Sequence, residues 1–292
     1  MKISDPGPAV LQAATGGDLA ALDTVLLAIQ PGVFNLAVRM LGNREDAADA
    51  TQEILLKVVT HLGSFRADAA FTTWVYQVAR NHLLTAATRS KESPEVSLEG
   101  IAERLQQGLD FAASLGDPDR TARSLTPEDK LEARQVALGC TQNMLMALDR
   151  DQRLVYVLDI VFGLPSAQAA EVLAISPQAY RQRLSRARAK LEAFAGQNCG
   201  HVNHEAACRC EQQLPAVRQL RASAAASSPR TIAIHRAELA QAEKQFAGLL
   251  RIGDAAAVFR AHPAYQASDA LRGAIRAVLR TEGYLDGDRP VH

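Results

Sequence analysis

Apolar residues recur every three or four positions along much of the chain, a spacing typical of amphipathic helices. In the most regular stretch, residues 177–194, this stripe consists of Tyr180, Leu184, Ala187, Leu191 and Phe194. Ser176 suits the cap of this helix, and Pro177 suits its first turn, where the amide that proline lacks would go unpaired. A short helix is expected over 166–174, followed by a tight turn. Two short helices joined in this way predict a helix-turn-helix.

The N-terminal part shows the same periodicity. Pro31-Gly32 interrupts it, so we expect separate helices over 9–29 and 31–41. Another helix should follow Asn43, a suitable cap, with acids in its first turn where they suit the helix dipole. Its inward face is predicted to hold Ala47, Ala50, Ile54, Val58 and Leu62.

The stretch 71–91 predicts a helix with two contrasting faces. Its apolar arc, expected to be core, holds Val75, Val78, Ala79, His82, Leu83 and Ala86. The opposite arc is a hydrogen-bonding stripe of Thr73, Gln77, Arg80, Asn81, Thr85 and Thr88, with Trp74 at its edge. Such a stripe can read unpaired bases through polar contacts and stacking. Packing in the core is the alternative for Trp74, and His82 is expected to be a buried structural histidine.

The rest of the chain is also predicted to be helical. Residues 131–162 should form helices that break near Asp149, and the end of the chain should form helices over 232–252, 255–261 and 268–281. Before them, 92–130 has proline, glycine and an acidic excess typical of a linker, with one short helix at 98–109. The predicted fold class is therefore all-α.

Charge is distributed unevenly over a chain whose formal net charge is +0. Bases crowd the helix at 176–190, which holds no acid, whereas acids outnumber bases in 92–130. This segregation indicates nucleic-acid binding by one helix, despite the neutral total.

Other features exclude several classes of protein. There is no uninterrupted run of eighteen apolar residues and no signal peptide, so we expect a cytoplasmic protein without a membrane partner. The chain has no Walker loop, no dinucleotide glycine pattern and no nucleophile with a spaced histidine and acid. We therefore expect that this protein is not an enzyme.

Sulfur and imidazole ligands gather after the basic helix. Within a few positions the chain carries Cys199, His201, His204, Cys208 and Cys210. These residues suit a four-coordinate zinc site, or a copper site using the Cys-x-Cys pair. A redox-sensing thiol cluster and reduced structural cysteines are the alternatives. The fourth cysteine, Cys140, has apolar neighbours and is expected to be an inert core thiol.

Three motifs, in this order, carry a resemblance to a known family: DAADATQEILLKVVTHLGSFR, FTTWVYQVARNHLL, and the helix-turn-helix with RQRLSRARAKL. Over about residues 10–195 the chain resembles the extracytoplasmic-function (ECF) sigma factors of the sigma-70 family. The resemblance implies a subunit that joins the bacterial RNA polymerase core, at the β′ clamp helices and the β flap. It also implies an N-terminal domain that opens and holds the −10 promoter element and a C-terminal domain that reads the −35 element. It implies no cofactor for this activity.

The resemblance also assigns residues. The polymerase contact corresponds to Asp46, Asp49, Gln52 and Glu53. The segment that captures the −10 strand corresponds to Phe71, Thr72, Thr73, Arg80 and Asn81, to which the polar stripe adds Trp74 and Gln77. The recognition helix corresponds to Arg181, Arg183, Ser185, Arg186 and Arg188. Near the helix start, Gln178 and Arg181 are expected to read bases, and Arg186, Arg188 and Lys190 to contact phosphates. The chain departs from many relatives where LLTAATRSK replaces an arginine-rich run.

The predicted domains are sigma region 2 at 1–91, an acidic flexible linker at 92–130, sigma region 4 at 131–195, and a helical extension at 196–292. We expect the extension to fold onto a sigma domain and gate polymerase binding in place of a separate anti-sigma factor. Two alternatives remain at this point. One is an autonomous helix-turn-helix regulator with a metal- or redox-sensing tail, and the other is a protein that sequesters the polymerase.

Overall fold

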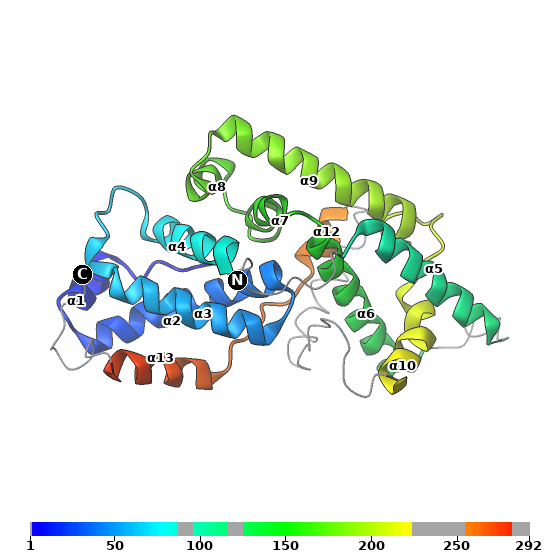
Figure 1. Ribbon diagram of the computed structural model, residues 1–292, viewed down its shortest axis with the longest axis horizontal. Coiled ribbons are helices and arrows are strands. Elements are labelled where there is room, and N and C mark those ends of the chain that lie inside the picture. Colours follow the sequence, from blue (N-terminus) through cyan, green and yellow to red (C-terminus); the bar gives the residue numbers. More distant parts are fainter. Residues whose placement is uncertain (1, 87–95, 116–124, 224–254, 282–292) are drawn as a thin grey trace. The chain divides into compact units, whose positions relative to one another are not determined.

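The computed structural model describes residues 2–86, 96–115, 125–223 and 255–281, and their regular elements are helices (Figure 1). The fold-class prediction is thus confirmed. The chain forms two compact units: the first consists of Met1–Glu92, Val157–Arg181 and Ala264–His292, and the second of Ser93–Tyr156 and Gln182–Pro263. Each unit therefore combines segments that are far apart in the sequence.

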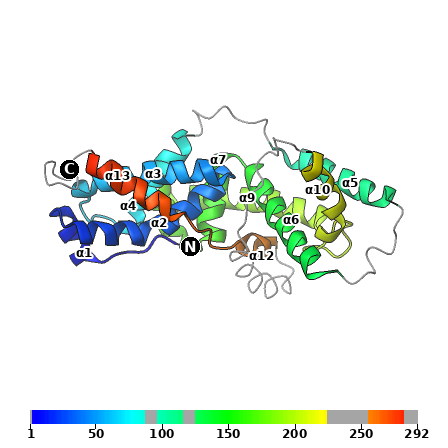
Figure 2. The ribbon, with the colours of Figure 1, turned by 90° about the horizontal axis from the view of Figure 1, so that it is seen from below.

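The first unit contains one continuous N-terminal series of helices and two later segments of the chain. Its elements are α1 (Pro8–Thr15), α2 (Leu19–Leu41), α3 (Arg44–Thr60), η1 (Leu62–Ser64), α4 (Phe71–Ala86), the π-helical turn η3 (Val157–Val161), α8 (Ser166–Leu173), the start of α9 (Pro177–Asn198), and α13 (Asp269–Thr281). Helix α2 packs against α1, α3 and α4, and α13 lies along α3 (Figures 1 and 2).

The predicted helix break at Pro31-Gly32 is wrong, because α2 runs through both residues. The actual break comes earlier, at Gly16-Gly17, where Asp18 caps α2 by accepting from the Ala21 amide at 2.9 Å. Pro31 is exposed, so the backbone hydrogen bond that proline cannot donate is missing on the solvent-facing side of the helix. Gly32 is needed for close approach: a Cβ there would collide with the backbone of Ile3.

Helix α2 is also, among the described residues, the one helix that is long and apolar enough to cross a membrane. In the structure, 67% of that apolar stretch is buried inside the protein. The composition of α2 is thus accounted for by its place in the helical core.

The faces predicted for α3 and α4 are largely confirmed. The inward face predicted here is buried at every position: Ala47, Ala50, Ile54 and Val58 of α3 and Leu62 of η1 are at most 6% exposed. Asn43 caps the helix by accepting from the Glu45 amide at 2.7 Å. On α4, Val75, Ala79 and Leu83 are buried, and His82 is 8% exposed, as expected for a structural histidine.

A buried polar group joins the C-terminal segment to α2. The Asn35 amide donates to the Tyr265 carbonyl and its oxygen accepts from the Tyr265 amide, both at 2.8 Å. Arg39, fully buried, lies over the rings of Tyr265 and Phe162, with its guanidinium carbon 5.0 and 5.7 Å from their centroids. Burial lowers the pKa of Arg39 to about 10, so it remains charged at neutral pH. The aromatic faces compensate part of the cost of burying that charge.

The helix α13 completes this attachment. Its apolar stripe of Leu271, Ile275 and Leu279 is at most 6% exposed. At its outer side, the Nε and Nη2 atoms of Arg276 donate to the Asp23 carboxylate, both at 2.8 Å. The predicted helix at 268–281 is therefore present and is part of the core of the first unit.

The helices of the predicted helix-turn-helix are present, and α8 and the start of α9 belong to the first unit. Ala169, Ala170 and Leu173 of α8 are buried, and Ala174 ends the helix in the left-handed conformation, with φ 51°. The Ser176 hydroxyl accepts from the Ala179 amide at 3.2 Å and so caps α9. Along α9, the predicted stripe is buried throughout, from Tyr180 to Phe194.

The second unit holds the other helices. They are α5 (Leu98–Ser114), α6 (Pro127–Met146), α7 (Arg150–Tyr156), the rest of α9, η4 (Cys210–Gln213), α10 (Leu214–Ser223) and α12 (Ala255–Arg260). Helix α5 is longer than the short helix expected in the linker and packs on α6, η4 and α10. The helices α6 and α7 are separated near Asp149, as predicted.

Ion pairs fasten α10 to the start of α6. Arg218 donates to Asp129 at 2.6 Å and to Glu132 at 2.7 Å, and Arg221 donates to Glu132 at 2.9 Å. Hydrogen bonds from Arg218 and Thr126 lower the pKa of Asp129 to about 2. The predicted helix at 232–252 lies outside the described residues.

Candidate functional site

The acids of α3 form one exposed face opposite the buried one. Asp46, Asp49 and Glu53 are exposed, and Gln52 is half-buried. At 100° per residue, these four side chains fall within about 120° of the helix circumference. The fold thus leaves a compact acidic surface on a helix that is rigidly packed on its other side.

The polar stripe of α4 is less accessible than the acids of α3. Asn81 and Thr85 are exposed and Thr72, Gln77 and Arg80 are half-buried, but Thr73 is 1% exposed. Thr88 lies outside the described residues. Phe71 is 2% exposed and lies in an aromatic cluster, with ring centroids 5.5 Å from Phe65 and 5.9 Å from Trp74. Phe71 thus serves packing here, while Trp74 is half-buried, with one side in that cluster.

Helix α8 covers the start of this stripe. Gln168 donates to the Thr73 hydroxyl at 3.2 Å, and Gln77 donates to the backbone carbonyl of Glu171 at 3.1 Å. Both contacts lie within the first unit. Two residues expected to face a DNA strand are thus bonded to the helix-turn-helix of their own chain.

The basic face of α9 is open. Gln178, Arg181, Ser185, Arg186, Arg188 and Lys190 are all exposed. Helical geometry places Gln178, Arg181, Ser185 and Arg188 on one arc, with Arg183, Arg186 and Lys190 on the neighbouring arc. Arg183 donates to Asp151 at 3.1 Å, and Lys190 donates to Gln152 at 3.0 Å. The arrangement suits a helix that reads base edges along one line and holds phosphates beside it.

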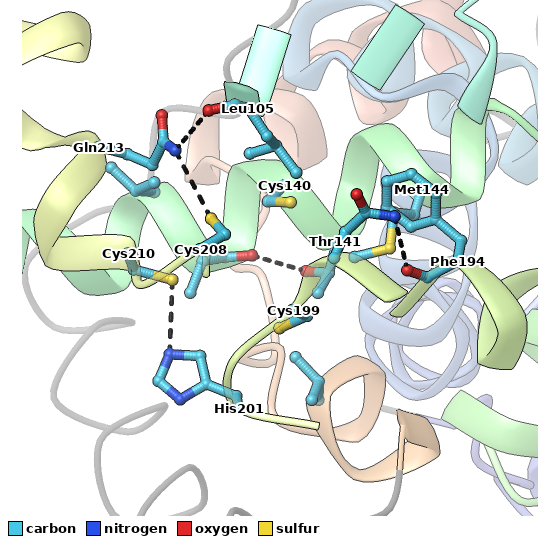
Figure 3. Close-up of a pocket in the computed structure, with 14 residues that line it drawn as sticks. Leu105, Cys140, Thr141, Met144, Phe194, Cys199, His201, Cys208, Cys210 and Gln213 are labelled. Carbon is cyan, nitrogen blue, oxygen red and sulfur yellow. Dashed lines mark hydrogen bonds between the residues drawn. The ribbon is translucent and has the colours of Figure 1, made fainter. Parts of the chain in front are cut away.

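The cysteines surround one small cavity in the second unit (Figure 3). The cavity measures about 30 Å³, and its lining includes Cys140, Cys199, His201, Cys208 and Cys210. A β-bridge pairs Cys199 with Cys208, and the Gly200 amide donates to the Cys208 carbonyl at 3.0 Å. Cys140 comes from α6, which makes it a member of the cluster that linear spacing did not reveal.

Three of the thiols that line the cavity have raised pKa values. Burial raises the pKa of Cys140 to about 12, and burial likewise raises the pKa values of Cys208 and Cys210. Burial lowers the pKa of His201. Because the thiolate is the reactive form, the shifted thiols are poor nucleophiles at neutral pH.

The predicted metal ligands are only partly brought together. Cys199, His201, Cys208 and Cys210 line the cavity, whereas His204 is exposed and is not in its lining. In the described parts of the chain, no group of three or more His, Cys, Asp or Glu side chains is arranged to hold a metal ion.

Sequence reasoning missed the contacts that depend on the chain's long-range folding. Gln168 and the Glu171 carbonyl lie against α4 although they are more than ninety residues away in the sequence. Asn35 and Tyr265 are 230 positions apart. No local pattern marks such partners; the only signal for Cys140 was its residue type.

The chain matches the models of two known families. The family model for Sigma-70 region 2 matches residues 26–92, which include α3 and α4. The model for Sigma-70, region 4 matches residues 138–191, which include α8 and most of α9.

Individual relatives give the same result. The chain is 27% identical to the RNA polymerase sigma-H factor of Pseudomonas aeruginosa over 180 residues, 60% of this chain and 86% of the relative. It is 27% identical to the ECF RNA polymerase sigma factor SigW of Bacillus subtilis over 175 residues, 60% of this chain and 89% of that one. It is 29% identical to the ECF sigma factor SigM of Mycobacterium tuberculosis over 187 residues, covering 64% and 83%.

A solved structure, described as CnrH in complex with the cytosolic domain of CnrY, is similar at a TM-score of 0.45 and 22% identity, over 65% of this chain and 97% of that one. The two family matches, in this order, and the named relatives lead to one conclusion: this chain belongs to the extracytoplasmic-function sigma factors of the sigma-70 family.

Proposed function

We propose that this sigma factor binds the polymerase core through the acids of α3, holds the −10 strand along α4 and reads the −35 duplex with α9. The observation that carries the proposal is the exposure of Asp46, Asp49 and Glu53 on a helix whose opposite face is entirely buried. Glu53 lies 3.7 Å from the His82 Nδ1, but it is still exposed, and exposed acids on one rigid face suit a charged partner surface. The β′ clamp helices are the proposed partner for this face, and the β flap is the proposed partner for region 4.

The proposed promoter contacts divide by chemistry. On α9, arginines on phosphates supply affinity that falls with salt, and Gln178 and Arg181 select bases in the major groove. On α4, Asn81, Arg80 and Gln77 offer hydrogen bonds, and Trp74 offers a stacking surface, to unpaired bases. Since Thr73 and Gln77 are held by α8 in this structure, strand capture requires that α8 leave α4.

The C-terminal extension is proposed to stabilise region 2 and, through the fold of that region, to regulate the activity of the sigma factor. The segment from Tyr265 through α13 packs on α2 and α3 but leaves Asp46, Asp49 and Glu53 exposed. It therefore holds region 2 together without masking the proposed polymerase face. This arrangement favours regulation through the fold of region 2 over direct blocking; a separate anti-sigma factor is the alternative source of control.

Neither the fold nor the surfaces call for covalent chemistry by this chain, and we expect it to act in the cytoplasm, where the polymerase is. An autonomous regulator would need neither the acidic face of α3 nor the polar stripe of α4. A protein that only sequesters the polymerase would need α3 but not the basic face of α9.

Run-off transcription separates the sigma-factor proposal from these two alternatives. Purified core polymerase is combined with the full chain on sheared genomic DNA of the source organism, and transcript 5′ ends are mapped. A sigma factor yields start sites that core alone does not use, with shared −35 and −10 sequences upstream. An autonomous regulator or a sequestering protein yields no such sites, and that result would refute the proposal.

A further inference from the structure

We propose that Cys140, Cys199, Cys208 and Cys210 form a structural zinc site that fastens the C-terminal extension to region 4. This ligand set differs from the one expected from spacing alone: Cys140 enters it and His204 leaves it. The four sulfurs come from three different places in the chain, namely α6, the residue that follows α9, and the stretch from Cys208 to the first residue of η4. They line the same cavity, which is visible in Figure 3.

The number and type of donors suit zinc. Structural zinc sites are four-coordinate and closed, and four cysteines make a complete set without an open position. Thiolates select zinc over the hard cations magnesium and calcium. The cavity of about 30 Å³ lies among the thiols, so the site has space between its donors.

Neighbouring groups are placed to support bound thiolates. Gln213 donates to the Cys208 sulfur at 3.5 Å, and the His201 Nε2 lies 3.5 Å from the Cys210 sulfur. Such outer contacts orient metal ligands and stabilise their charge. Arg104 acts electrostatically on Cys140 and Arg209 on Cys208 in the sense that favours thiolates, while Glu211 opposes them at Cys208.

The loop that carries these cysteines needs a cross-link. Between Cys199 and Cys210 the chain forms turns and a single β-bridge, and only Gly200 and Ala206 are buried. Small segments without a hydrophobic core commonly depend on a metal for their fold. Since the side chains as they stand do not converge on a metal position, zinc binding includes rotation of the thiols into the cavity.

The main competing use of these residues is a Cys199–Cys208 disulfide. Paired strands lie about 4.8 Å apart, which falls within the Cα separation of disulfides. Such a bond would leave Cys140 and Cys210 without a role, although they line the same cavity. The zinc site uses all four.

The test is elemental analysis of the full chain, purified untagged in reducing buffer without chelator and then given Zn²⁺. One zinc per chain is expected for the wild type and for His204→Ala, the matched control. Cys140→Ser should lose the zinc, and Cys140→His should regain it, because zinc accepts three cysteines and one histidine. His201→Ala should keep the stoichiometry but lower zinc affinity by about 10- to 100-fold, as expected for an outer contact.

A second readout needs no variant. When a mercurial reagent titrates the thiols of the zinc-loaded wild type, one zinc should be released as four cysteines react. Cobalt substitution should give the sulfur-to-metal charge-transfer absorption of tetrahedral thiolate coordination. Wild-type chain that stays zinc-free after Zn²⁺ addition, Cys140→Ser that retains a full equivalent, or a Cys199–Cys208 disulfide in thiol-trapped protein would each overturn the inference. None of these outcomes depends on transcription, so they leave the proposed function untouched.

Discussion

Two faces of the first unit, on α3 and on α4, are both assigned to binding, yet the structure leaves them in different states. The acids of α3 face solvent, while Thr73 and Gln77 of α4 are bonded to α8. The contrast suggests an order of events, because only the open face can make a first contact. In this view the polymerase binds α3 first, and its separate contact with region 4 then draws α8 away from α4. DNA binding by the free chain is thereby limited.

Charge reversal on α3 is expected to have the largest effect, because it removes the proposed contact with the polymerase core. Asp49→Arg combined with Glu53→Arg should weaken core binding by about 30-fold or more, since breaking interfacial charge pairs costs roughly 2–5 kcal/mol. Affinity is measured by fluorescence anisotropy with labelled sigma factor.

The matched control is Glu99→Arg with Glu103→Arg, two exposed acids of α5 at the same spacing. It changes the net charge equally. Equal losses in both double variants would show that α3 has no special role.

The basic face of α9 is exposed, as the acidic face of α3 is, and its proposed partner is duplex DNA. Arg181→Ala should cost about 1–3 kcal/mol on the preferred −35 sequence and relax the choice of one base. Arg188→Ala should weaken all sequences alike and lower the slope of log affinity against log salt by about 1.

Binding by holoenzyme is measured on a panel of single-base promoter variants. Arg276→Ala removes the same charge from the ion pair with Asp23 and serves as control. Unchanged base preference in Arg181→Ala would assign base reading to other residues.

Weakening the attachment of the C-terminal extension tests whether the extension restricts polymerase binding by the α3 acids. Asn35→Ala leaves the buried amide and carbonyl of Tyr265 without their side-chain partner, so the free energy of unfolding should fall by about 2–4 kcal/mol. Core affinity at a temperature where the variant remains folded should stay unchanged.

Urea denaturation gives the first quantity and anisotropy the second. Tighter core binding by Asn35→Ala would mean that the tail does restrain α3, contrary to the exposure of its acids.

The smallest expected effect concerns the covered face. Gln168→Ala removes the bond to Thr73, worth about 0.5–1.5 kcal/mol, and should raise the free chain's affinity for single-stranded −10 DNA by about 2- to 10-fold. Quenching of Trp74, the single tryptophan of the chain, reports the binding.

Glu171→Ala is the control on the same helix, because Gln77 bonds the backbone carbonyl of that residue and not its side chain. A Gln168→Ala variant with wild-type affinity would show that α8 does not compete with DNA.

Local patterns in the sequence predicted what depends on local physics. The buried stripe of α9, the Ser176 and Asn43 caps and the core face of α3 follow from helical periodicity and capping chemistry, and all are present. The predicted helix break at Pro31 is wrong because proline is tolerated on the exposed side of a helix, where the missing backbone hydrogen bond costs little free energy. The cover of α4 by α8 and the recruitment of Cys140 depend on contacts between distant segments, which no single-sequence period encodes.

The most direct test of the account compares free sigma factor with holoenzyme for binding of a single-stranded −10 oligonucleotide, its sequence taken from the mapped start sites. The account predicts that the holoenzyme binds at least about 10-fold more tightly, because the polymerase releases α4 from α8. Equal affinity of the free chain, with the Gln168–Thr73 contact intact, would contradict it.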